Sequence, residues 1–85
     1  MAELTVRYFA AARAAAGTDL EVLPLPPGPY TLDDLVRELA ARHGPEFSRV
    51  LPACSFLLDE VVVHSRAAQL SDGAVLDVLP PFAGG

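Results

Sequence analysis

The 85-residue chain contains no lysine and no tryptophan, and Cys54 is its single cysteine. All six basic residues are arginines, which are scattered between positions 7 and 66 without forming a run. Proteins that bind nucleic acid draw much of their affinity from clustered cations on phosphates, so this distribution argues against that class. One cysteine cannot form an internal disulfide, which suits a reducing compartment.

Long apolar segments are missing as well. No apolar run approaches the ~20 residues that a membrane-spanning helix needs, and no apolar stretch follows a basic region at the N-terminus as in a signal peptide. We therefore expect a cytoplasmic protein that binds no membrane. Eleven acidic residues give a net charge of −5, which favours encounter with a basic partner. A domain this small has a modest core, so chemistry is expected at an edge, an end or a shared interface.

Segments in which side chains alternate between two faces predict about five strands. They are expected at residues 3–9, 20–25, 55–63 (two strands around a turn at Asp59-Glu60) and 74–79. On the first strand Leu4, Val6 and Tyr8 share the predicted core face, and on the last strand Leu76 and Val78 do. Pro24 restricts its strand to an edge or a strand end. The first and last strands are central if they pair in parallel.

One main helix is predicted from Thr31, its N-cap, to the Gly44-Pro45 stop. Asp33 and Asp34 occupy its first turn, and apolar residues form one stripe along it. Shorter helical turns are expected over residues 10–16, before Gly17, and over residues 46–51, ended at Pro52. This order predicts an α+β domain in which the main helix packs on one face of a mixed sheet.

The side chains that most often carry chemistry have ordinary explanations here. His43 falls in the last turn of the main helix, where a polar or cationic group suits the dipole. His64 has no cysteine or carboxylate at metal-ligand spacing, and Cys54 has no obvious base nearby. The paired acids Asp33-Asp34 and Asp59-Glu60 suit a helix start and a turn. The sequence therefore predicts no metal site and no active site within this chain.

The C-terminus is the exception. We predict a domain over residues 1–79 followed by an extended tail over residues 80–85, because Pro80 and Pro81 discourage both helix and strand pairing. Six residues reach about 20 Å at roughly 3.3–3.6 Å each. Gly84 and Gly85 remove every side chain near the carboxylate, so a narrow channel in another protein could close around bare backbone. A frayed end is the alternative that composition alone leaves open.

This tail resembles that of the molybdopterin synthase small subunit, a ubiquitin-like family of sulfur carriers. The resemblance rests on Pro80-Pro81-Phe82-Ala83-Gly84-Gly85, on Leu70-Ser71-Asp72-Gly73 before the last strand, on Val6-Arg7-Tyr8-Phe9-Ala10-Ala11-Ala12-Arg13 with Gly17 soon after, and on Thr31-Leu32-Asp33-Asp34-Leu35. It covers nearly the whole chain in order. One departure is the turn at Asp59-Glu60, which lacks the Asn or Gly that such hairpins favour.

The resemblance implies a β-grasp fold and a carrier role. In that family an adenylyltransferase related to ubiquitin-activating enzymes uses ATP and Mg to adenylate the terminal glycine, and a sulfur donor protein converts it to a thiocarboxylate. The carrier then delivers sulfur to a cyclic pterin phosphate in the large subunit of a heterotetrameric synthase. Transferred to this chain, Gly85 carries the sulfur and residues 80–84 thread the partner's channel. No cofactor is expected on this chain, because the ATP and pterin sites belong to partners.

A docking patch is predicted beside the tail. Strand alternation places Phe9 and Leu79 on the sheet face opposite the helix, and Val62 joins them if Val61 and Val63 point inward. With Phe82, this patch would dock on the large subunit. Three alternatives stay open: a sulfur carrier for thiamine biosynthesis or tRNA thiolation, a protein modifier joined to target lysines, and an interaction domain with an inert tail.

Overall fold

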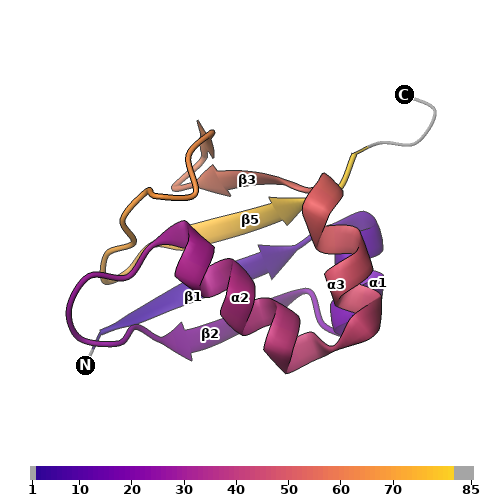
Figure 1. The fold of residues 1–85 in the computed structure, drawn as a ribbon, viewed down its shortest axis with the longest axis horizontal. Helices are drawn as coiled ribbons and strands as arrows, with labels where there is room; N and C mark the ends of the chain where they lie inside the picture. The colour runs from indigo at the N-terminus through magenta and orange to yellow at the C-terminus, as the bar shows by residue number, and fades with distance from the viewer. Residues whose placement is uncertain (1, 82–85) are drawn as a thin grey trace.

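The computed structural model describes residues 2–81, in which helices cover one face of a five-stranded sheet (Figure 1). The elements in chain order are β1 (Glu3–Tyr8), α1 (Ala10–Ala16), β2 (Leu20–Pro24), α2 (Leu32–His43), α3 (Pro45–Val50), a 3-10 turn (Leu51–Ala53), β3 (Ser55–Leu58), β4 (Val61–Val63) and β5 (Val75–Leu79). The predicted α+β class is confirmed. The prediction that Pro52 ends a helical turn is wrong, because Pro52 lies inside the 3-10 turn.

The strands lie in the order β2-β1-β5-β3-β4. β1 and β5 are parallel neighbours at the centre, and every other neighbouring pair is antiparallel. This confirms the mixed sheet with the first and last strands in its middle. Pro24 ends the edge strand β2, where a residue without a backbone donor disturbs the ladder least.

The core lies between the sheet and the helices. As predicted, Leu4, Val6 and Tyr8 of β1 and Leu76 and Val78 of β5 are each at most 2% exposed. They pack in one cluster with residues from all three helices, which are Ala12, Leu32, Leu35, Val36, Leu39 and Phe47. Period-two alternation in the strands and the apolar stripe of α2 therefore predicted the buried face correctly.

A capping box fixes the start of α2. The Thr31 Oγ1 accepts the Asp34 N–H at 3.2 Å, and the Asp34 Oδ2 accepts the Thr31 N–H at 2.9 Å. The Thr31 hydroxyl also donates to the Asp34 Oδ2 at 3.0 Å. The bond from the Thr31 backbone N–H, and then the one from its hydroxyl, lower the pKa of the Asp34 carboxyl from its ordinary 3.8. The N-cap predicted from sequence is thus confirmed.

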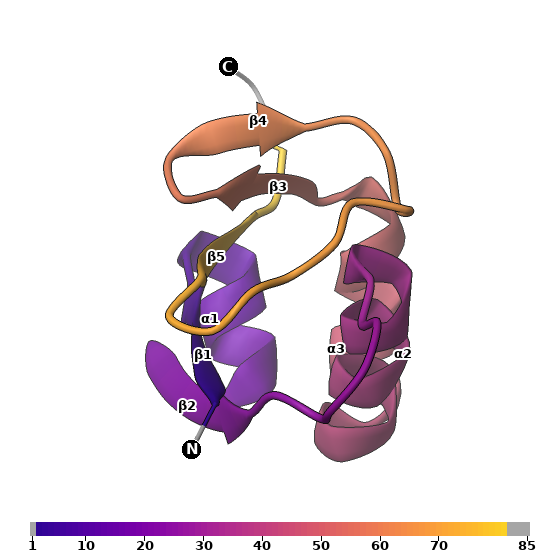
Figure 2. The same cartoon turned by 90° about the vertical axis from the view of Figure 1, so that its left-hand side faces the viewer.

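The opposite face of the sheet carries no helix among residues 2–81. Figure 2 shows α1, α2 and α3 gathered to one side of the strands. We call the bare side the open face. None of the helices over these residues has the length and apolar character to cross a bilayer.

Candidate functional site

The tail begins where the central strand β5 ends. Leu79, the last residue of β5, lies opposite Ser55 of β3 and is half-buried. Pro80 is buried and Pro81 is exposed, so packing continues one residue past the end of the strand. The remaining predicted tail residues, Phe82, Ala83, Gly84 and Gly85, lie outside the described residues.

The open face carries the residues of the predicted docking patch. Phe9 is 39% exposed and Val62 is 53% exposed. Tyr8 lies opposite Val78 in the parallel pair, and the Phe9 N–H donates to the Val78 carbonyl at 3.2 Å, so Phe9 follows β1 alongside the Leu79 end of β5. The predicted strand parity is confirmed, and the docking role stays a prediction.

The condition attached to Val62 is met. Val63 lies opposite the core residue Phe56 and packs against the core. Val61 lies opposite Leu58, which in turn lies opposite the core residue Leu76, so Val61 is also on the helix side of the sheet, although it is 67% exposed. It sits beside the hairpin turn on the edge strand β4, where no neighbouring strand covers its outer side.

Two further apolar residues of the open face were missed. Leu20 is 47% exposed and Val22 is 51% exposed. The sequence placed them on one face of their strand, but only the register shows which face that is. Leu20 lies opposite Arg7, and Val22 lies opposite Thr5. The exposed apolar surface therefore extends from the edge strand β4 to the edge strand β2.

One row of directly opposed residues crosses the open face through all five strands. We call it the central row, and it consists of Leu20, Arg7, Asp77, Leu57 and Val62. At its middle, Arg7 Nε lies 2.5 Å from Asp77 Oδ1, and Arg7 Nη2 lies 2.8 Å from Asp77 Oδ2. Asp77 is only 5% exposed. The hydrogen bond and charge of Asp77 raise the pKa of Arg7, so the pair is a fixed, bidentate ion pair.

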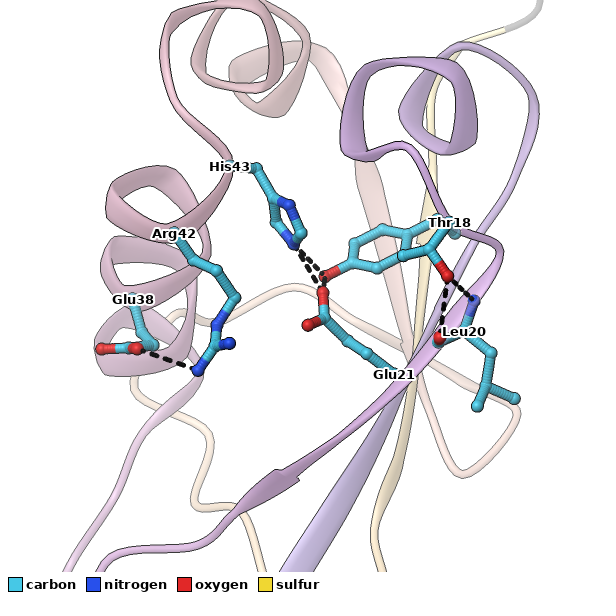
Figure 3. Close-up of polar contacts among 7 residues, drawn as sticks. Thr18, Leu20, Glu21, Glu38, Arg42 and His43 are labelled. Carbon is cyan, nitrogen blue, oxygen red and sulfur yellow. Dashed lines mark hydrogen bonds and ion pairs between the residues drawn. The ribbon is translucent and has the colours of Figure 1, made fainter.

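A second polar cluster lies on the helix side of the sheet. His43 Nε2, at the end of α2, lies 2.5 Å from Glu21 Oε2 on β2, and the Tyr8 hydroxyl donates to the same carboxylate (Figure 3). Burial, then the hydrogen bond to Glu21, raises the pKa of Tyr8 above 10.0. The ring of Phe47 stacks edge-on against Tyr8 with 5.4 Å between centroids. This cluster ties the end of α2 to the edge strand and supports the structural interpretation of His43.

Cys54 and His64 line one pocket beside β3, but over residues 2–81 no hydrogen bond joins the two side chains. The Cys54 thiol is half-buried and donates to the Val50 carbonyl at 3.3 Å, and burial raises its pKa, so it is a poor nucleophile. Among residues 2–81, no three His, Cys, Asp or Glu side chains gather as a metal site would require. The described part of the molecule offers an exposed apolar face beside the end of β5, where Pro80 and Pro81 follow the strand.

Comparison with known proteins shows which family and which relatives this chain is similar to. The model of the ThiS family matches residues 6–85. The chain is 32% identical over 84 residues to the molybdopterin synthase sulfur carrier subunit of Chlamydomonas reinhardtii, covering 98% of this chain and 99% of that protein.

Two solved structures have the same fold. One, from Pyrococcus furiosus, is described as a molybdopterin converting factor subunit 1, with a TM-score of 0.83, 30% identity and coverage of 96% of this chain and 100% of that chain. SAMP1 from Haloferax volcanii also has a TM-score of 0.83, at 22% identity over 98% of this chain and 99% of that one. At that identity SAMP1 supports the fold alone.

Proposed function

This chain belongs to the ThiS family, and on that premise we propose that Gly85 carries sulfur to the large subunit of a molybdopterin synthase. The observation that carries the proposal is the match to a sulfur carrier subunit over 98% of this chain, together with a family model that extends to Gly85. The open face at the root of the tail is consistent with a protein whose tail works inside a partner.

The proposed chemistry starts from the carboxylate of Gly85, which is a poor electrophile until it is activated. A carboxylate oxygen of Gly85 attacks the α-phosphate of Mg-ATP on the adenylyltransferase, and pyrophosphate leaves. Sulfide-level sulfur supplied by a donor protein then attacks the acyl carbon of Gly85 and AMP leaves, which yields a thiocarboxylate. Inside the large subunit that sulfur bonds to a side-chain carbon of the cyclic pterin phosphate as a carbon–oxygen bond there breaks. Hydrolysis of the resulting thioester then leaves the sulfur on the pterin and returns the Gly85 carboxylate. A tethered and enclosed sulfur makes the attack effectively intramolecular and keeps bulk water from the thiocarboxylate.

The docking patch supplies the positioning that this chemistry needs. Phe9, Leu79 and Val62, with Phe82, are proposed to bind the large subunit and to aim the tail, while Pro81, Ala83 and Gly84 thread the channel of the large subunit. Pro80 is buried in the free carrier, so we assign it to fixing the direction in which the tail leaves the sheet. Pro81 is exposed and available to the partner.

Reconstitution tests the proposal. The purified carrier is incubated with the adenylyltransferase, the sulfur donor and ATP, and the mass of its C-terminal peptide is measured before and after adding the large subunit with the cyclic pterin phosphate. We expect one oxygen of Gly85 to be exchanged for sulfur, and that sulfur to be lost as the dithiolene forms. Transfer to a thiazole precursor or to tRNA, or an amide bond to a target lysine, would instead support one of the alternatives.

A further inference from the structure

The Arg7–Asp77 ion pair has no role in the sulfur chemistry, yet it occupies the centre of the open face. It joins the two central strands, and the residues beside it in the central row, Leu20 and Leu57, are apolar. Ion pairs removed from water are often no more stabilising than apolar side chains of similar volume. Stability alone therefore gives little reason for a charged pair at this position.

Arg7 keeps a donor that the carrier itself does not use. Its Nε and Nη2 bind the two oxygens of Asp77. Its Nη1 has no acceptor among residues 2–81, and the side chain is 38% exposed, so water can satisfy that nitrogen in the free carrier. A partner that covers the open face removes this water and must supply an acceptor, because a buried unsatisfied donor is costly.

The charges around Arg7 select the kind of acceptor. Asp77 already neutralises the guanidinium, and the charge of nearby Glu60 acts on it as well. Residues Arg7, Asp59, Glu60 and Val75 line a shallow pocket at this point of the face. The local charge is therefore negative, which disfavours a carboxylate and suits an uncharged oxygen.

We propose that Arg7 is a specificity-determining residue of the docking face, and that its free Nη1 binds a neutral acceptor on the large subunit, either a backbone carbonyl or a side-chain amide oxygen. The inference rests on the proposed function, because it names the large subunit as the occupant of this face. That occupant follows from continuity, since Asp77, the middle residue of the central row, lies on the strand β5 that leads into the tail. Asp77 is a positioning residue, whose two carboxylate oxygens hold the Nε and Nη2 of Arg7.

The test replaces Arg7 and Asp77 together, so that neither charge is left on the sheet without its partner. In R7L/D77L the open face becomes wholly apolar along the central row. The matched control is E46L/R49L, which removes an exposed ion pair with a 2.9 Å contact on α3, on the helix side. Binding of each carrier to the purified large subunit is measured by calorimetry, and folding is checked by thermal melting of the free carrier.

We expect R7L/D77L to raise the Kd about ten- to hundredfold, because the acceptor of the large subunit loses its donor. The control should bind like the parent. Equal or tighter binding by R7L/D77L would overturn the inference, because a merely structural pair can be exchanged for apolar side chains without loss of affinity. Failure of the parent carrier to bind the large subunit would instead count against the proposed function.

A measurement on the unaltered carrier keeps the test independent of folding. With arginine labelled by 15N, the guanidinium signals of Arg7 are followed by NMR while the large subunit is added. We expect the Nη1 hydrogens to become protected from exchange with water. Exchange that stays as fast in the complex as in the free carrier would overturn the inference, whatever the variants show.

Discussion

Truncating Phe9 separates docking from folding. Phe9 is 39% exposed, so an aromatic side chain of roughly 200 Å² leaves about 80 Å² that a partner can cover. At about 25 cal/mol per Å², that area contributes about 2 kcal/mol of binding free energy, or about thirtyfold in Kd. Phe9 precedes α1 as its N-cap but makes no side-chain capping bond, so Phe9→Ala removes no cap.

Leu76→Ala is the matched core truncation. Leu76 is 1% exposed, and its loss should cost about 2–5 kcal/mol of folding stability. A domain of this size loses about 4–8 °C in Tm for each kcal/mol, so Leu76→Ala should melt at least about 8 °C below the parent. Phe9→Ala should lose no more than about half as much, because its contacts in the free carrier are partial.

Both variants are compared in two assays, calorimetric titration with the large subunit and thermal melting followed by circular dichroism. We expect Phe9→Ala to bind about thirtyfold more weakly, and Leu76→Ala to bind like the parent at temperatures where it is folded. The docking assignment is wrong if Phe9→Ala melts as low as Leu76→Ala while its affinity equals that of the parent.

Three further outcomes are expected. Deleting Gly85 should leave the circular dichroism spectrum and the Tm unchanged and reduce sulfur transfer to background; transfer at the parent rate would exclude Gly85 as the carrier residue. The net charge of −5 should make association with a basic partner fall as salt rises above about 0.1 M, where the Debye length is about 10 Å, and a rate insensitive to salt would contradict this. Because the folded-state pKa of Asp34 is lowered, its stabilisation holds above 3.8 and is lost as the pH falls through the lowered value. The difference in Tm between the parent and Asp34→Asn should therefore shrink in acid, and a difference that stays constant down to about pH 2 would show that the carboxylate is not the stabilising form.

Local signals were sufficient to predict the elements of the fold. Thr31 and Asp34 stand three residues apart, and their capping box needs only that spacing. The alternation of β1 likewise placed Phe9 opposite the core without knowledge of any neighbouring strand. Each of these predictions depends on residues close together in the chain, where backbone geometry alone fixes the relation between side chains.

The centre of the open face could not be predicted in the same way. Arg7 and Asp77 are 70 positions apart, and their contact depends on the parallel register of β1 and β5. The face on which Leu20 lies depends on the register of the antiparallel pair β1 and β2, and a shift of one residue would turn Leu20 to the helix side. The contact of Glu21 with His43 joins an edge strand to a helix end, which no periodicity reveals.

The Asp59-Glu60 turn shows how tertiary contacts override a turn rule. Both residues have positive φ, at 49° and 70°, which is the conformation that Asn and Gly usually supply in tight hairpins. The Asp59 Oδ1 accepts the Val75 N–H at 3.0 Å, and the Asp59 N–H donates to the Val75 carbonyl at 2.8 Å. The bonds to β5 hold the turn in place, so the missing Asn or Gly altered neither the hairpin nor its register.

The position of β5 also determines how the molecule responds when its tail is pulled. When the chain is pulled by its C-terminal end, the force acts along β5, because the sequence continues directly from Leu79. β5 is hydrogen-bonded to β1 on one side and to β3 on the other, so those bonds lie across the direction of pulling and are loaded together in shear. An edge strand would instead be held from one side only. A terminal strand placed in the middle of the sheet thus resists unravelling when the chain is pulled by its end.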